Sequence, residues 1–233
     1  MFTRDFDAAV THFSQHLESG HSRWMIALAG LPGSGKSTLA ARLIEKVNIR
    51  VPGAMVALSM DGFHLTQEQL RQMPNPEAAF ARRGAPWTFD VAALAQRLQE
   101  VRSGAGRQPI AWPDFQHEIG DPVEAVHFVA PETRLVLVEG NYLLQRRDAW
   151  ELIGSFFDER VYLDVPLEVA MERLTTRHMT AWNWTRLQAQ NRIAANDKLN
   201  AQLVLQDLEH GDWRLVMEPK SARRDYKGSH GHL

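Results

Sequence analysis

The stretch Trp24–Ser37 reads WMIALAGLPGSGKS, and it decides the fold. Its first part, residues 24–29, is a short continuous apolar run, which is typical of a strand buried on both faces of a sheet. A glycine-rich turn follows, and apolar residues then recur at helical spacing from Leu39 to Ile44. The sequence therefore predicts a strand, a glycine turn and a helix over about residues 37–47, without a break between them.

The glycine turn matches the phosphate-binding pattern of a glycine, four residues and then Gly-Lys-Ser/Thr. In such a loop the backbone N–H groups converge on phosphate oxygens, and the start of the helix adds the positive end of its dipole. We expect Lys36 to reach the β- and γ-phosphates and the Ser37 hydroxyl to take one Mg²⁺ position. The predicted nucleotide-binding residues are Gly30, Leu31, Pro32, Gly33, Ser34, Gly35, Lys36, Ser37 and Thr38.

Three more apolar runs, at residues 54–60, 135–138 and 160–163, are predicted to be strands. The first ends in Asp61 and the second in Glu139, each followed by glycine, and the third leads to Pro166, which suits the first turn of a helix. Helices and strands alternate along the chain. The pattern predicts a three-layer α/β/α fold of the P-loop NTPase type, with a mainly parallel sheet.

The stretch 62–133 is long for a connection inside a compact domain, and such connections are usually functional. It holds one clear helix, from a predicted N-cap at Asp90 to Arg102. We predict one P-loop domain over residues 1–220, with a substrate-capping insertion at about 62–133 and a lid at about 173–190. Residues 221–233, which are polar and contain glycine, are expected to form a flexible tail.

Composition narrows the possible partners. The chain has 26 basic and 28 acidic residues and a net charge of −2, so no nucleic-acid partner is expected. It has no cysteine, which excludes disulfides and thiolate metal sites. No apolar run approaches the ~20 residues that cross a bilayer, and the first twenty residues do not resemble a signal peptide. We expect a cytoplasmic protein with no membrane partner.

Two missing motifs and the two acids at strand ends indicate which class of nucleotide-binding enzyme this is. The chain has neither the Asn-Lys-x-Asp motif that reads guanine nor a Leu-Ser-Gly-Gly transporter signature. Asp61 follows a strand at the sheet edge where ligands bind in open α/β folds, and its carboxylate can take the proton of an attacking hydroxyl. Its structural alternative is an ordinary turn aspartate. Glu139 is expected to orient Mg²⁺ or its water.

The chain resembles the superfamily of phosphoribulokinase, uridine kinase and pantothenate kinase. Besides the P-loop, the resemblance lies in MDGFH at 60–64, RRGAPWTFD at 82–90, PDFQH at 113–117 and VEGNYLL at 138–144. In particular it is similar to bacterial proteins described as nucleoside/nucleotide kinase-like or as fructose transport system kinases. The resemblance implies a small-molecule kinase that uses ATP and Mg²⁺ to phosphorylate a hydroxyl of a small metabolite. It also leaves a homodimer open.

The resemblance also implies roles for individual residues. Asp61 would be the catalytic base, Lys36 would hold the phosphates, and Arg177 would offset charge on the transferring group as the lid closes. The predicted substrate-binding residues are Asp61, His64, Arg83, Phe115 and His117, and the predicted metal-binding residues are Ser37 and Glu139. Pantothenate kinases of this type have a tyrosine where Phe115 stands, so this chain lacks one hydroxyl contact.

Several alternatives stay open from the sequence. The acceptor can be a sugar, a nucleoside or a pantothenate-like alcohol. The rival class is a nucleotide-dependent switch or chaperone-like ATPase without a small-molecule acceptor, and a degenerate kinase that only binds nucleotide is a third reading. Arg173 shares a helix face with Arg177. Asn196, Asp197 and Asn200 fit either a place near the adenine or lid or a polar helix surface, and the aromatic stretch 181–184 either closes over nucleotide or buries the next helix.

Overall fold

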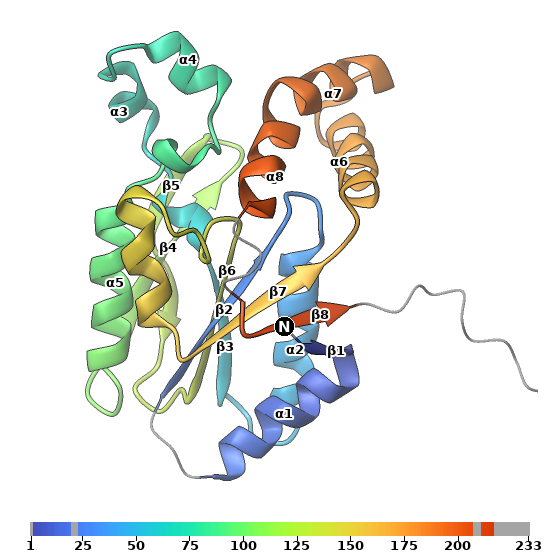
Figure 1. The fold of residues 1–233 in the computed structure, drawn as a ribbon. Coiled ribbons are helices and arrows are strands. Elements are labelled where there is room, and N and C mark those ends of the chain that lie inside the picture. The colour runs from blue at the N-terminus through green and yellow to red at the C-terminus, as the bar shows by residue number, and fades with distance from the viewer. Residues whose placement is uncertain (1, 20–22, 207–210, 217–233) are drawn as a thin grey trace, which may run out of the picture.

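The computed structural model describes residues 2–19, 23–206 and 211–216 of the chain (Figure 1). Its centre is a six-stranded sheet in the order β1-β8-β7-β2-β6-β3, in which every neighbouring pair is parallel. The carboxyl ends of all six strands therefore meet at one edge of the sheet. The strands are β1 (Phe2–Arg4), β2 (Trp24–Gly30), β3 (Met55–Ser59), β6 (Leu135–Gly140), β7 (Glu159–Asp164) and β8 (Trp213–Val216).

The four predicted strands are confirmed, each within two residues at either end. Their buried pattern explains why they could be predicted, because β2 and β6 are buried almost throughout and lie side by side in the sheet. The sequence analysis did not predict β1 and β8. These strands are only three and four residues long, and they pair with each other at one side of the sheet.

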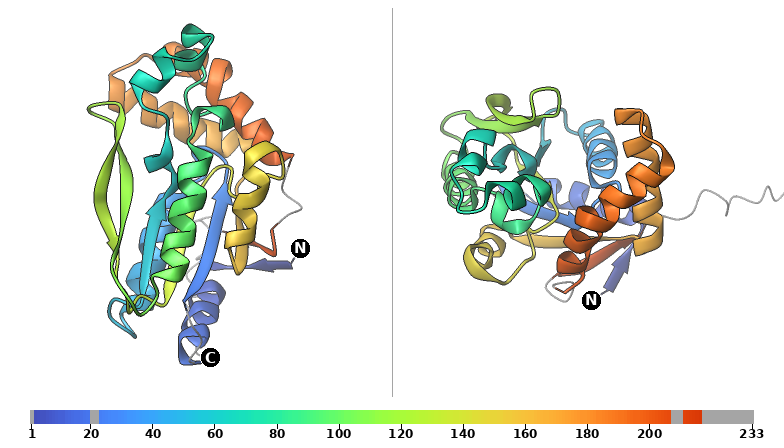
Figure 2. Two further views of the ribbon diagram at one scale, coloured as in Figure 1. Left: turned by 90° about the vertical axis from the view of Figure 1, so that its left-hand side faces the viewer. Right: turned by 90° about the horizontal axis from the view of Figure 1, so that it is seen from above.

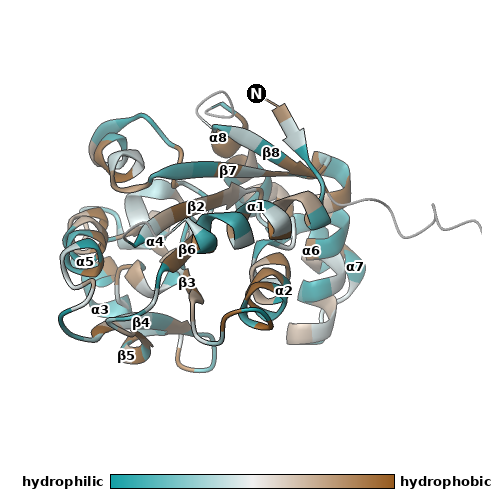
Figure 3. Cartoon of the chain, turned by 90° about the horizontal axis from the view of Figure 1, so that it is seen from below, coloured by the Kyte–Doolittle hydropathy of each residue, from teal (hydrophilic) through white to brown (hydrophobic). Residues whose placement is uncertain are grey.

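Helices cover both faces of the sheet, as a three-layer fold requires (Figure 1). On one face α1 (Phe6–Glu18) packs on α2 (Lys36–Asn48), and on the other α5 (Val91–Ser103) packs on the 3₁₀-helix η3 (Asp148–Phe156). Figure 3 shows the central strands as apolar, with polar residues on the outer helices. Asp90 caps α5 as predicted, because its side chain accepts a hydrogen bond from Ala93 N at 2.9 Å.

Two groups of helices stand above the carboxyl edge of the sheet (Figures 1 and 2). The first belongs to the insertion and contains η1 (Met60–Phe63), α3 (Gln67–Arg71), α4 (Pro76–Ala81) and η2 (Pro86–Thr88). The second contains α6 (Leu167–Trp182), α7 (Arg186–Arg192), the π-helix η4 (Ile193–Asp197) and α8 (Lys198–Leu205). Pro166 is the N-cap of α6, one residue before the first turn in which we expected it.

The insertion also holds a β-hairpin that the sequence analysis missed. Its strands β4 (Ile110–Gln116) and β5 (Asp121–Val129) are antiparallel and form a separate two-stranded sheet, seen edge-on in the left view of Figure 2. Pro113 lies inside β4, where the register shifts between Trp112 and Asp114. Most of β5 is exposed, so it lacks the alternation that would have revealed it.

The predicted tail, residues 221–233, lies outside the described residues. In the part of the chain that the structure describes, no helix is both long and apolar enough to cross a membrane.

A buried carboxylate ties the N-terminal helix to the far side of the sheet. Glu159 in β7 is 8% exposed, and its oxygens lie 2.8 and 3.0 Å from His12 Nε2 of α1. Trp213 of β8 donates its indole N–H to the same carboxylate. Burial alone would raise the pKa of Glu159, but hydrogen bonding and charge from His12, together with the indole donors, outweigh it and hold the pKa below its ordinary value.

We predict that Glu159→Gln lowers the free energy of unfolding by about 1 to 3 kcal/mol at pH 7. Since the folded pKa is lower than the unfolded one, the ionised carboxylate stabilises the fold above the unfolded pKa of ~4.3. That contribution is lost as the pH falls through the folded pKa. The difference in free energy of unfolding between variant and wild type should therefore disappear below about pH 4. Urea unfolding from pH 7 to pH 3 measures this, with the exposed Glu151→Gln as control. A gap that is constant with pH would contradict it.

Candidate active site

The P-loop is fixed from above by α6. Gly33 has φ of +76°, and a Cβ on it would lie 2.4 Å from the backbone oxygen of Ala170. Only glycine fits that approach. Arg173, further along α6, donates from Nη1 to the backbone oxygen of Ser34 at 2.8 Å. Loop and helix are thus packed against each other.

Lys36 is buried and held by oxygen atoms. Its Nζ donates to Asn141 Oδ1 at 2.7 Å and to the backbone oxygens of Gly30 and Leu31 at 3.1 Å. Burial lowers the pKa of Lys36, while the charges of nearby acids act in the opposite direction. Asn141 lies two residues beyond the predicted metal-binding acid, inside the family-like segment 138–144, but the sequence analysis gave it no role.

Ser37 and Glu139 are in contact at the start of α2. The Ser37 hydroxyl donates to Glu139 Oε1 at 2.7 Å, and burial raises the pKa of Glu139. A hydroxyl and a carboxylate side by side are the oxygen ligands that Mg²⁺ prefers. Among the described residues no group of three or more His, Cys, Asp or Glu side chains could hold a metal by itself. These residues therefore fit a Mg²⁺ ion that also takes phosphate and water as ligands.

Two cavities meet at this point. The first, the P-loop cavity, has a volume of about 460 Å³ and lies over the loop; the second, the hairpin cavity, has about 410 Å³ and lies between α2, β3 and the β4–β5 hairpin. Ser37, Asp61 and Glu139 line both of them. The predicted base and the predicted metal ligands therefore stand where the two cavities join.

Asp61 owes its place to the short 3₁₀-helix that follows β3. The hydroxyl of Ser59 accepts a hydrogen bond from Asp61 N at 3.1 Å and so caps η1. A Cβ on Gly62 would lie 2.3 Å from the backbone oxygen of Pro113, so glycine lets η1 approach β4 directly. The hairpin is thereby held next to the predicted base.

His64 lines the P-loop cavity and is held by the backbone of Asp61. Its Nδ1 lies 2.8 Å from the backbone oxygen of Asp61. Because a carbonyl can only accept, Nδ1 carries the proton in this contact. Burial lowers the pKa of His64, which favours the neutral ring, so Nε2 keeps its lone pair.

The predicted substrate residues form one connected cluster. The Phe115 ring lies 4.8 Å from that of His64 and 5.3 Å from that of His117, and Arg83 lies 5.0 Å above it. The four nevertheless face different spaces, because Arg83 and His64 line the P-loop cavity while Phe115 and His117 line the hairpin cavity. Arg83 is also paired with Asp121, at 3.1 Å.

The two lid arginines are not equivalent. Both line the P-loop cavity, but Arg173 is bound to the loop backbone. Arg177 makes no hydrogen bond or ion pair with any of the described residues. The aromatic stretch after it packs locally, since Trp182 stacks on His178 at 4.5 Å and lines neither cavity.

Asn196 and Asn200 join the second helix group to the insertion. Both are buried, at 2% and 3% exposure, so a polar helix surface is the wrong interpretation. Arg82 donates from Nε to Asn196 Oδ1 at 3.1 Å and from Nη2 to Asn200 Oδ1 at 2.8 Å, and Asn196 returns a hydrogen bond to the backbone oxygen of Arg83 at 2.9 Å. We call these three side chains the amide clamp. The π-helix that carries Asn196 is a feature often found at functional sites.

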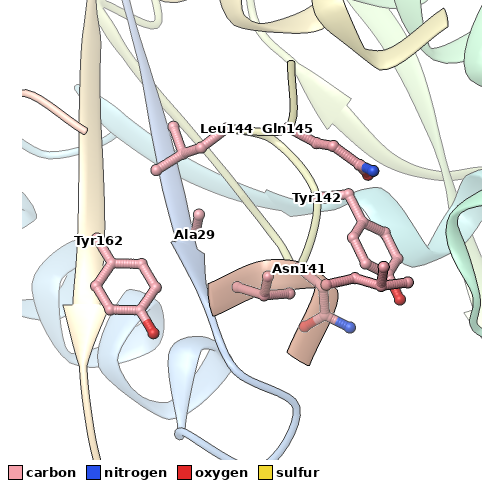
Figure 4. Close-up of a pocket in the computed structure, with 8 residues that line it drawn as sticks. Ala29, Asn141, Tyr142, Leu144, Gln145 and Tyr162 are labelled. Atoms are coloured by element: carbon pink, nitrogen blue, oxygen red, sulfur yellow. The ribbon is translucent and has the colours of Figure 1, made fainter. Parts of the chain in front are cut away.

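A third, much smaller cavity lies behind the site. It has a volume of about 10 Å³, close to what one water molecule needs, and Figure 4 shows Asn141 and Gln145 on its wall. The buried Oε1 of Gln145 accepts no hydrogen bond from the described residues. This cavity is too small for a metabolite. The P-loop and hairpin cavities are the ones that the predicted base and metal ligands line.

A phosphate loop, a buried lysine and a strand-end acid beside a serine define the class of P-loop nucleotide-binding enzymes. A protein of Schizosaccharomyces pombe provisionally named a uridine kinase is 40% identical over 184 residues, which are 78% of each chain. An ATP-dependent kinase-like protein of Aspergillus versicolor is 38% identical and covers 69% of this chain and 99% of its own. No family model matches the chain.

Solved structures agree with these relatives. A Silicibacter protein provisionally described as a fructose transport system kinase superposes with a TM-score of 0.75 at 27% identity, over 90% of this chain and 98% of its own. The chain belongs to the P-loop kinases of the uridine kinase and pantothenate kinase superfamily, and it is a small-molecule kinase. The predicted family and fold class are confirmed.

We predict that Arg82→Ala lowers the free energy of unfolding by about 2 kcal/mol, because it removes the donor of the buried Asn200 Oδ1 and one of the two donors of Asn196 Oδ1. Arg192→Ala is the matched control, since Arg192 also reaches the insertion, donating to the backbone oxygen of Ala81 at 2.7 Å, but at an exposed position. Arg192→Ala should lower the free energy of unfolding by less than about 1 kcal/mol. Urea unfolding of both variants measures this, and equal effects would contradict a special role of the amide clamp.

Proposed function

We propose that this kinase transfers the γ-phosphate of ATP to a hydroxyl group of a small metabolite, with Asp61 as the base. The observation that carries the proposal is the place of Asp61, which lines both the P-loop cavity and the hairpin cavity. A base there can reach a hydroxyl that enters from one side and a phosphate held on the other. In-line transfer requires this arrangement.

The triphosphate lies in the P-loop cavity, against the loop amides and Lys36. Ser37 and Glu139 would hold Mg²⁺, which would supply positive charge to the phosphates. Lys36 needs little movement to reach the phosphates, because Asn141 and the loop carbonyls already hold its ammonium at the loop. Such preorganisation is the main source of catalysis in phosphoryl transfer.

The acceptor lies against the hairpin, with Phe115 and His117 as contacts and His64 and Arg83 behind them. The insertion at about 62–133 caps this molecule. The lid at about 173–190 closes the phosphate side, with Arg177 as the cation that offsets charge in the transition state. Arg177 suits this role better than Arg173 because Arg173 already holds the P-loop backbone.

The hairpin cavity also favours a kinase over a nucleotide-dependent switch or chaperone-like ATPase. A switch needs no acceptor pocket next to its phosphate site. Here a cavity of about 410 Å³ adjoins Asp61, and its volume lies in the range of small-molecule sites.

We expect Asp61→Asn to keep its affinity for Mg-ATP and to lose about 10²- to 10⁴-fold in kcat, because the amide cannot accept the hydroxyl proton. Titration calorimetry measures the affinity. Coupled release of ADP measures the turnover against fructose, uridine, cytidine and pantothenate.

Two control variants accompany this measurement. Lys36→Ala gives the blank for nucleotide-dependent turnover. Asp148→Asn is the matched substitution at an exposed aspartate, whose φ of +51° asparagine tolerates, and it should leave kcat unchanged. Retained turnover in Asp61→Asn would remove Asp61 as the base.

A further inference from the structure

The hairpin cavity carries negative charge and no cation of its own. Its described lining includes the carboxylates of Asp61, Asp114 and Glu139. No lysine or arginine is among those lining residues, although two histidines, His117 and His127, are. A carboxylate or phosphate group on the acceptor would therefore enter a space already lined by like charges, and it would have no fixed cation to meet.

Among the cations near the site, Arg177 lines the P-loop cavity and not the hairpin cavity, and the arginines closer to the hairpin are already paired. The guanidinium of Arg83 pairs with Asp121 at 3.1 Å and donates to the backbone oxygen of Leu65 at 2.8 Å. Arg97, close to the hairpin, pairs with Glu100 at 3.1 Å and Glu124 at 3.4 Å. Lys36 faces the phosphates. None of these side chains remains to neutralise an anionic acceptor.

The polar groups around Asp61 are mainly hydrogen-bond acceptors, so they favour a ligand that carries hydrogen-bond donors. Ionised carboxylates can only accept hydrogen bonds. His64, which lines the P-loop cavity, uses its protonated nitrogen on the backbone oxygen of Asp61, at 2.8 Å, and so has no second N–H to offer. A molecule rich in O–H or N–H groups satisfies these acceptors, whereas an acid group does not.

One wall of the hairpin cavity is apolar. It consists of small or aliphatic side chains of α2 and β3: Ala40, Ala41, Ile44, Ala57 and Leu58. The opposite wall carries the ring of Phe115. Such surfaces suit the carbon face of a ring whose edge bears the hydroxyl groups.

Resting on the proposed function, we infer that the acceptor is an uncharged, hydroxyl-rich ring compound of the sugar or nucleoside kind. The carboxylates of the hairpin cavity disfavour acids and phosphorylated compounds as acceptors. The acceptor hydroxyl gives its proton to Asp61, its oxygen forms the new bond to the γ-phosphorus, and the bond from that phosphorus to the β,γ-bridging oxygen breaks to release ADP.

The first test compares acceptors in pairs that differ by one charged group: fructose with fructose 6-phosphate, uridine with uridine monophosphate, glycerol with glycerate, and panthenol with pantothenate. ADP release from Mg-ATP by the full chain is measured for each, with Lys36→Ala as the blank. We expect fructose or uridine to stimulate release, and its charged partner to show kcat/KM at least about tenfold lower. A charged compound as the best acceptor would overturn the inference while leaving the kinase proposal intact.

The second test removes one charge from the cavity wall. Asp114→Asn should narrow the ratio of kcat/KM between uncharged and charged partners about fivefold, because one like charge is gone. Glu124→Gln is the matched control on the other strand of the same hairpin, outside the cavity lining, and should leave that ratio unchanged. A purely structural effect would lower both members of a pair alike.

The two failures can be told apart. An unchanged ratio in Asp114→Asn, with active enzyme, would overturn the inference about charge alone. A panel in which no acceptor raises ADP release above the Lys36→Ala blank would overturn the proposed function and this inference with it.

Discussion

The structure depends most on one buried charge, the ammonium of Lys36. Burying a cation costs several kcal/mol unless oxygen atoms surround it. Here loop carbonyls at the end of β2 and the Asn141 amide after β6 provide those oxygens, and the charges of Asp61 and Glu139 act in the same direction. The neighbouring strands β2, β6 and β3 must therefore end together, which a parallel sheet in this order achieves.

The two helix groups above the sheet contact different parts of the site around Lys36. α6 holds the P-loop through the close approach at Gly33 and the hydrogen bond of Arg173. The amide clamp ties the same half of the molecule to the insertion, across a separation of 114 to 118 residues in the chain. The helix group that holds the P-loop is thus joined to the insertion by hydrogen bonds to two buried amides.

What could be predicted from the sequence was local. The P-loop, the strand-end acids and the Asp90 cap each follow from residues within a few positions of one another, so pattern alone finds them. The hairpin was not predicted, because most of β5 is exposed and Pro113 interrupts β4. The partnership of Lys36 with Asn141 spans 105 residues, and that of Arg82 with the buried amides spans more. No local pattern encodes such pairs, since only the packed sheet brings them together.

The position of the shared acids links catalysis to selectivity. Ser37, Asp61 and Glu139 line both cavities, so the charge of the two acids acts in each of them. With Mg-ATP bound as we propose, the metal ion and Lys36 would offset this charge around the phosphates, but the wall formed by the hairpin lies on the other side of Asp61. Asp114 on that wall adds a further carboxylate. A hairpin cavity with no lysine or arginine among its described lining residues therefore suits the uncharged acceptor that we infer.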